Sequence, residues 1–272
     1  MRLSLACTLA LLLVTGCITP AVPPDGGVDA TDAGIETDAG VQDAGFEVDA
    51  GTEDAGTFED AGTDGGTMLP APGFGVISGA CGMLDDELTS AEPDFFVNRI
   101  DFGTDPYDDG DFDLLTAGGQ EIINDGNAGG SSILSEVFSY ELLSRCEGAA
   151  LLKTETEVQY TNSQGKITDL LVEIDGLKVG VSVTRAVAFP FENPYTVDQA
   201  QEILERKLQD ILASSARVAP ADKWVKQVLY VIAYGEGHAT SLETAYDQID
   251  PSLKADTIVM VTISDGADDF IY

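Results

Sequence analysis

The polar residues that could form a site gather on one predicted β-hairpin, residues 166–185. Asp175-Gly176 lies between two apolar runs, and a two-residue turn of this kind needs positive φ at both positions, so the pair is a strong hairpin signal. The turn fixes the register and places Asp169 opposite Ser182. Strand alternation gives one apolar face and one polar face, the latter formed by Asp169, Glu173, Lys178, Gly180, Ser182 and Thr184. We expect the apolar face to pack in a core, and the polar face, where a glycine leaves room, to carry any site.

The segments around this hairpin must position it. They are a helix over 131–147, a strand over 151–160, the hairpin, a helix opened by the capping box Thr196–Gln199, a strand over 227–234, a helix over 240–248 and a strand over 257–263. This order, α-β-β-β-α-β-α-β, predicts an α/β fold with a central mixed sheet and helices on both faces.

With Asp169 on the second strand and a polar face on the third, this order resembles the restriction-endonuclease-like core of the PD-(D/E)XK nuclease superfamily over residues 131–264. In that superfamily an Asp ends the second strand, a Glu-x-Lys stands on the third, and a Glu on the first helix often joins them. The carboxylates bind a divalent metal that activates water and stabilises charge on the scissile phosphate. The resemblance implies that Asp169 and Glu136 are catalytic and metal-binding residues, with Mg²⁺ or Mn²⁺ as cofactor.

The sequence departs from that pattern at the third strand. Ser182 and Thr184 occupy the Glu and Lys positions of the catalytic set, so one carboxylate and the cationic helper are missing. Glu157, Glu155 or Glu173 could supply the missing ligand, and Glu157 joins Asp169 and Glu136 in the metal set that we expect. Arg185 could supply the cation, although strand alternation points it away from Thr184.

Two functions remain open for this core. The departure at the third strand favours a degenerate nuclease-like domain that serves binding or a structural role. The alternative is an active divalent-metal-dependent nuclease or phosphodiesterase with a rearranged ligand set. No nucleophile elbow, phosphate loop or zinc spacing occurs in the sequence.

Residues 1–17 form a secretion signal. Arg2 precedes a short apolar core, residues 3–14, and Val14-Thr-Gly-Cys17 resembles the bacterial lipobox. The resemblance implies that Cys17 is lipidated, so the chain is a membrane-anchored lipoprotein. Because Ile18 is not Asp, it also implies outer-membrane sorting, on either the periplasmic or the external side of the cell envelope.

Two further segments separate this signal from the core. Residues 18–70 contain Asp-Ala-Gly six times and little apolar surface, which predicts a disordered acidic linker that averages about 40 Å end to end. Residues 71–130 are rich in Gly and Asp, and we expect an irregular subdomain that packs on the core domain, residues 131–272.

The charge of the chain bears on its partners. The net charge is −35, and the part from Ala71 onward carries 35 acidic and 12 basic residues. Because a polyanion is held by Lys and Arg, this balance disfavours nucleic acid as a partner, and nothing in the sequence identifies a protein partner.

The cysteines bear on the compartment. Cys7 leaves with the signal and Cys17 takes lipid, so Cys81 and Cys146 remain. In an oxidising compartment we expect them to form a disulfide, with two buried free thiols as the alternative.

Overall fold

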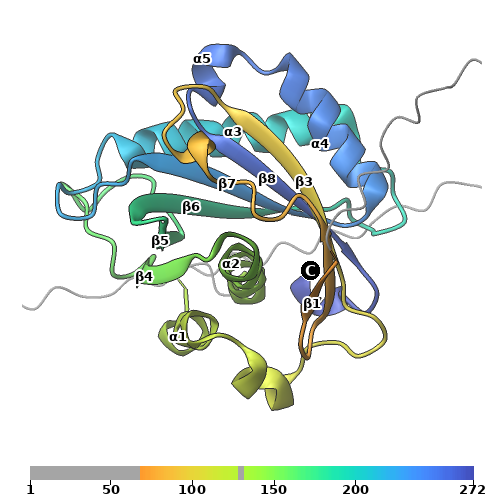
Figure 1. The fold of residues 1–272 in the computed structure, drawn as a ribbon. Coiled ribbons are helices and arrows are strands. Elements are labelled where there is room, and N and C mark those ends of the chain that lie inside the picture. Colours follow the sequence, from red (N-terminus) through yellow and green to blue (C-terminus); the bar gives the residue numbers. More distant parts are fainter. Residues whose placement is uncertain (1–67, 128–131) are drawn as a thin grey trace, which may run out of the picture. The chain divides into compact units, whose positions relative to one another are not determined.

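An eight-stranded mixed β-sheet organises residues 68–127 and 132–272, the part of the chain that the computed structural model describes (Figure 1). The spatial order of the strands is β1-β2-β3-β8-β7-β6-β5-β4. The four central strands β3, β8, β7 and β6 run parallel to one another, and the outer pairs are antiparallel. The strands are β1 (Leu69–Ala71), β2 (Gly75–Gly79), β3 (Asp94–Asp101), β4 (Ala150–Thr154), β5 (Leu170–Ile174), β6 (Leu177–Ala186), β7 (Lys226–Ala233) and β8 (Ile258–Asp265).

Helices cover both faces of the sheet. Figure 1 shows α1 (Ala117–Asp125) and α2 (Ile133–Glu147) on one side, and α3 (Val197–Ser215), α4 (Glu236–Gln248) and α5 (Pro251–Lys254) on the other. Each side has its own apolar core, centred on α2 and on the pair α3 and α4. Short 3₁₀ turns occupy Asp86–Leu88, Asp109–Leu114 and Asp269–Ile271.

The element order from α2 onward is the one that the sequence predicts. The chain runs α2-β4-β5-β6-α3-β7-α4, then the short α5, then β8. The predicted α/β fold with a mixed sheet between helices is therefore confirmed. The predicted capping box also forms, because the Thr196 side chain accepts from the Gln199 N–H while the Gln199 side chain accepts from the Thr196 N–H.

The predicted hairpin forms, but its polar face is not open. Asp175 and Gly176 have φ of 50° and 77°, and Leu171 pairs with Gly180 as the register requires. The space above Gly180 holds the amide of Gln227 from β7, since a Cβ on the glycine would lie 2.9 Å from Gln227 Cδ. Ser182 is only 4% exposed. The room that the glycine leaves is thus used for packing between neighbouring strands.

The strand before the hairpin is shorter than the alternation predicts. β4 ends at Thr154, where a turn begins in which the Glu157 N–H donates to the Thr154 carbonyl at 3.1 Å. The Glu157 carboxylate accepts from the Thr154 N–H at 3.1 Å and so closes the turn from the other side. Glu155 is buried in this turn and Glu157 is exposed, so the two carboxylates have different environments.

The segment 71–130 differs from the irregular subdomain that we expect. Three strands at the start of the described chain extend the sheet, and β3 pairs with β8 along eight residues, from Asp94 opposite Ile258 to Asp101 opposite Asp265. The disulfide between Cys81 and Cys146 is confirmed, and it ties the chain after β2 to the last turn of α2.

The signal with the motif Val14–Cys17 and the Asp-Ala-Gly segment lie outside the described residues, apart from the last residues of the segment 18–70. Within the described ranges, every helix is too short or too polar to cross a lipid bilayer.

Candidate active site

Asp169 lies immediately before β5, beside the strand β6 that runs on to Ala186. Its N–H donates to the Val181 carbonyl at 3.0 Å, and its Oδ2 accepts from the Val183 N–H at 2.7 Å. The aspartate is thus placed across from Ser182 as the register predicts, but its carboxylate binds the backbone of the next residue. This contact fixes the carboxylate at the start of β5, beside the part of β6 after Val181 that no longer pairs with β5.

Glu136 reaches the same place from the first turn of α2. Its side chain is 4% exposed, and Oε1 accepts from Asn127 Nδ2 at 2.5 Å and from Ser132 Oγ at 3.1 Å. Burial raises the pKa of Glu136 to about 7, and the charge of Asp169 acts in the same direction. Burial also raises the pKa of Asp169, against the attraction of Lys207 and the hydrogen bond from Val183.

One cavity of about 200 Å³ brings these side chains together. α2 contributes Glu136 with Ser135, the strand edge contributes Asp169 and Thr184, and α3 contributes cations. The full lining is Ser132, Ser135, Glu136, Asp169, Val183, Thr184, Arg185, Arg206 and Lys207. Two acidic and three basic residues therefore line one cavity.

Lys207 is the residue of this site that the sequence analysis missed. The Lys207 Nζ donates to the Val183 carbonyl at 2.7 Å, and the Val183 N–H donates to the Asp169 carboxylate. Val183 thus holds the ammonium and the carboxylate beside each other. A signal exists in the sequence, because Lys207 lies on α3 between the fully buried Leu204 and Leu208, on a helix that must pack on the sheet.

Ser182 and Thr184, which occupy the Glu and Lys positions of the expected motif, lie in different environments. Thr184 lines the cavity, whereas Ser182 is buried and is not part of the lining. Arg185 also lines the cavity, against the alternation that points it away from Thr184. Its Nη1 donates to the carbonyls of Ile271 at 2.8 Å and Tyr272 at 3.3 Å, so the C-terminal residues hold the guanidinium at the end of β6.

A third carboxylate approaches from the turn after β4. Glu155 is 9% exposed, and its charge raises the pKa of both Asp169 and Glu136. It does not line the cavity itself. Of the three acidic residues considered as a replacement ligand, Glu155 is the one whose field reaches both site carboxylates.

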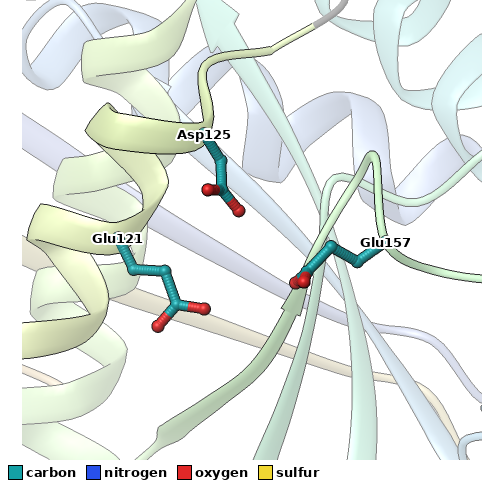
Figure 2. Close-up of side chains that lie close together, drawn as sticks. All are labelled: Glu121, Asp125 and Glu157. Atoms are coloured by element: carbon teal, nitrogen blue, oxygen red, sulfur yellow. The ribbon is translucent and has the colours of Figure 1, made fainter.

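Glu157 and Glu173 lie elsewhere. Glu157 forms a separate exposed group with Glu121 and Asp125 of α1, with one ligand oxygen from each within 4.8 Å of the others (Figure 2). In Figure 2 the three carboxylates point toward one another across the space between α1 and the turn. Glu173 is exposed on β5 opposite Lys178. The expected metal set of Asp169, Glu136 and Glu157 is thus split between two places.

Comparisons with known proteins give two partial likenesses. No family model matches the chain. The AAC-rich mRNA clone AAC4 protein of Dictyostelium discoideum is 40% identical over 154 residues, which is 54% of this chain and 22% of that protein, so the chain spans about a fifth of its length. SfsA of Pyrococcus furiosus, solved in complex with Ca²⁺, is similar with a TM-score of 0.25 and 15% identity over 49% of this chain and 56% of that one. Neither likeness shows a family for this chain.

Proposed function

We propose that the domain is a divalent-metal-dependent phosphodiesterase whose active site is the cavity lined by Glu136, Asp169 and Lys207. One observation carries the proposal: carboxylates from α2 and from the start of β5 face one cavity together with a lysine from α3. The negative charge and the replacement of the Glu and Lys positions by Ser182 and Thr184 are the reasons to expect a degenerate core. Lys207 offers an ammonium to the same cavity from another element.

Glu136 and Asp169 would hold the metal. The donor set fits a hard cation such as Mg²⁺ or Mn²⁺, because both groups are carboxylates with oxygen donors. Burial and the charges of neighbouring carboxylates raise the pKa of both groups. A bound cation would remove that repulsion, and Glu155 is near enough to contribute to the field. When bound, the metal supplies an activated water and charge stabilisation at the phosphate.

Lys207 would act on the substrate. Its ammonium is held beside Asp169 by the Val183 carbonyl, so it is fixed before the substrate arrives and can donate to a phosphate oxygen in the cavity. Arg185 and Arg206 share the lining and would attract the anionic substrate. These three cations offset locally a charge balance that is strongly negative over the whole domain.

A non-catalytic binding role is the second candidate. Two observations favour it: Ser182 is buried where the superfamily has a metal-binding carboxylate, and only two carboxylates line the cavity. A site with two carboxylates could still hold an ion without turning over a substrate. Hydrolysis therefore has to be measured separately from metal binding.

The test is a hydrolysis assay of the purified chain on bis(p-nitrophenyl) phosphate and on single- and double-stranded DNA and RNA, with Mg²⁺, Mn²⁺ or EDTA. We expect metal-dependent cleavage that falls by at least about a hundredfold in Asp169→Ala and in Lys207→Met. The matched controls are Glu173→Gln, an exposed carboxylate on the same hairpin, and Ser182→Ala, which should both keep the activity. Cleavage that persists in Asp169→Ala would rule out this site, and no metal-dependent cleavage of any substrate would favour the binding role.

We also propose that the domain is carried on the cell envelope, in the outer membrane, by a lipid on Cys17. The lipobox-like Val14–Cys17 and the acidic segment 18–70 support this, because together they give an anchor and a spacer. A tethered hydrolase of this kind would act on phosphodiesters at the surface or in the periplasm.

A further inference from the structure

The chain after β8 turns back and reaches a residue of the proposed active site. It forms the 3₁₀ turn Asp269–Ile271 and comes to lie beside the end of β6. There the Arg185 Nη1 donates to the backbone oxygen of Ile271 at 2.8 Å and to that of Tyr272 at 3.3 Å. Arg185 lines the cavity of the proposed active site. Residues 268–272, named the C-terminal turn below, therefore contact a cationic residue of that cavity.

Apolar side chains fix the C-terminal turn to the core. Phe270 packs against Phe138 of α2 and against Phe102, with ring centroids 5.2 Å and 5.0 Å apart. Ile271 is buried in the same apolar core. Because Phe138 lies two residues after Glu136 on α2, the turn packs on the helix that carries a carboxylate of the site.

A chain of hydroxyl groups fixes the Tyr272 side chain from β8. The Ser264 Oγ donates to the Asp268 Oδ2 at 2.6 Å and lies 2.6 Å from the Tyr272 hydroxyl. The Ala233 carbonyl, 3.4 Å from the same Oγ, is the weaker acceptor, because a carboxylate at the shorter distance binds the hydrogen more strongly. Ser264 has one hydroxyl hydrogen, so when Asp268 takes it the Tyr272 O–H must donate to Ser264. Both Ser264 and Asp268 are buried, which strengthens these bonds.

Arg185 meets this segment through one nitrogen only. Both of its hydrogen bonds use Nη1, and among the described residues none accepts from Nη2 or Nε. A long arginine side chain loses rotamer freedom when it binds a ligand, and this loss weakens the binding. The contacts of Nη1 with the C-terminal turn remove much of that freedom beforehand, which leaves the other nitrogens available to an anion.

We propose that Tyr272 is a positioning residue of the proposed active site, whose hydroxyl, bound to Ser264 and through it to Asp268, holds the backbone that fixes Arg185 at the cavity. This inference rests on the proposed phosphodiesterase activity, in which Arg185 meets a phosphate oxygen of the substrate. Tyr272 itself does not line the cavity, so its effect on the reaction passes through Arg185. A guanidinium that is held in place before charge develops stabilises the transition state better than one that must first be ordered.

The test is the kinetics of bis(p-nitrophenyl) phosphate hydrolysis by the purified chain in Mn²⁺. Tyr272→Phe removes the hydroxyl and keeps the ring, and we expect kcat to fall about tenfold while KM changes less than about twofold. Ser264→Ala should cause the same loss, because it interrupts the same hydrogen bonds. The matched control is Tyr234→Phe, which removes a hydroxyl from the ring that packs on Tyr272 with centroids 5.1 Å apart. The Tyr234 hydroxyl takes no part in the hydrogen bonds of Ser264, so kcat should stay within about twofold of the parent value.

The loss must also depend on Arg185. We expect Arg185→Ala to lower kcat about a hundredfold. In that background Tyr272→Phe should change kcat by less than about twofold, because the group that it positions is gone. A Tyr272→Phe loss that persists in the Arg185→Ala background, or that Tyr234→Phe equals, would overturn the proposal. A Tyr272→Phe variant more active than the parent chain would overturn it as well, since the C-terminal turn would then withhold the guanidinium from the substrate.

A second measurement is independent of hydrolysis. In the chain prepared with ¹⁵N-labelled arginine, the Arg185 signal is assigned by its loss in Arg185→Lys, and the exchange of its guanidinium hydrogens with water is measured by NMR. We expect this exchange to be at least about threefold faster in Tyr272→Phe than in the parent chain or in Tyr234→Phe. Absence of hydrolysis by the parent chain would overturn the phosphodiesterase. The exchange rates then decide the positioning role by themselves, because faster exchange in Tyr272→Phe supports it and equal exchange overturns it.

Discussion

The burial of the Glu136 carboxylate is unfavourable for stability when the group is ionised, but it suits a functional role. Its carboxylate is buried, lies in the field of Asp169 and has a pKa raised to about 7, so ionisation in the folded state is unfavourable. A structural role does not require this arrangement, since a glutamine could accept and donate hydrogen bonds in the same volume. The feature is typical of sites where an ion or a reaction uses the charge.

The free energy of unfolding should therefore fall as the pH rises from 4.5 to about 7, the range set by the raised pKa of Glu136. The folded pKa of Glu136 is raised above the ordinary 4.5, so between pH 4.5 and 7 the folded state keeps a proton that the unfolded state has lost. The free energy of unfolding should drop across this window, by up to about 3 kcal/mol from this residue. Urea unfolding in EDTA at pH 4.5 and at pH 8 measures it.

Glu136→Gln isolates this contribution. Asp169, Asp94 and Asp268 also have raised pKa values and push the pH dependence in the same direction, so only the difference between the variant and the parent chain belongs to Glu136. We expect the variant to be more stable at pH 8 and similar at pH 4.5, and to lose metal binding. An identical pH dependence in both proteins would contradict the buried, repelled carboxylate.

At the scale of elements, the sequence predicts those whose signals are local. Three such signals lie within short segments, and the structure has the predicted element at each. They are the Asp175-Gly176 turn, the Thr196–Gln199 capping box and the apolar run of β7. The strand β3 could not be predicted in this way. Its run Asp94–Asp101 becomes a strand by pairing with β8, more than 150 residues later in the chain, and a long-range parallel partner leaves no local mark.

The site residues also divide into those that the sequence predicts and those that depend on long-range packing. Asp169 and Glu136 were predicted as site residues from the resemblance to the nuclease superfamily, with Asp169 also placed by the hairpin register. For Lys207 the sequence offers only its place on α3 between Leu204 and Leu208, because its role depends on the packing of α3 against β6, which brings it to the Val183 carbonyl. The choice among Glu155, Glu157 and Glu173 depends on a turn after β4 that breaks the expected alternation. Tertiary packing, not local pattern, decides those positions.

The packing between β6 and β7 can be tested at Gly180. A Cβ there would lie 2.9 Å from the Gln227 Cδ, Nε2 and Oε1 atoms, so Gly180→Ala must push the amide away. We expect a loss of about 1–3 kcal/mol in the free energy of unfolding, measured with urea. In a Gln227→Ala background the new methyl group has room, and the loss should fall by at least about 1 kcal/mol. The same loss in both backgrounds would show that the amide is not what fills the space.

The disulfide joins two elements that are far apart in sequence. Cys81 and Cys146 are separated by 65 residues, and the same loop is held by Glu147, whose carboxylate accepts from the N–H groups of Gly82, Met83 and Leu84. Cys81→Ser with Cys146→Ser should lower the free energy of unfolding by about 4 kcal/mol, less whatever the Glu147 contacts retain. Reductant should destabilise the parent chain and leave this double variant unchanged. Labelling of either thiol in the native, unreduced protein would contradict the bridge.

At the scale of the whole molecule, the distribution of charge bears on the proposed substrate. The chain has a net charge of −35, yet Arg185, Arg206 and Lys207 line the cavity of the proposed active site. An acidic body repels anions, so these three basic residues would act as a local exception that attracts an anionic phosphodiester to the site.

The attachment of the chain gives the last prediction. If Cys17 carries the lipid, Cys17→Ala should leave the protein in the soluble fraction or block its maturation, because no other residue can accept the anchor at that position. Cys7→Ala is the matched control, since Cys7 lies inside the same signal and is removed with it. Ile18→Asp should move the protein from the outer to the inner membrane, because sorting depends on the residue after the lipidated cysteine. Membrane fractionation and mass measurement of the mature N-terminus check all three variants, and a Cys17→Ala protein that stays in the outer membrane would contradict the anchor while leaving the cavity chemistry of the domain untouched.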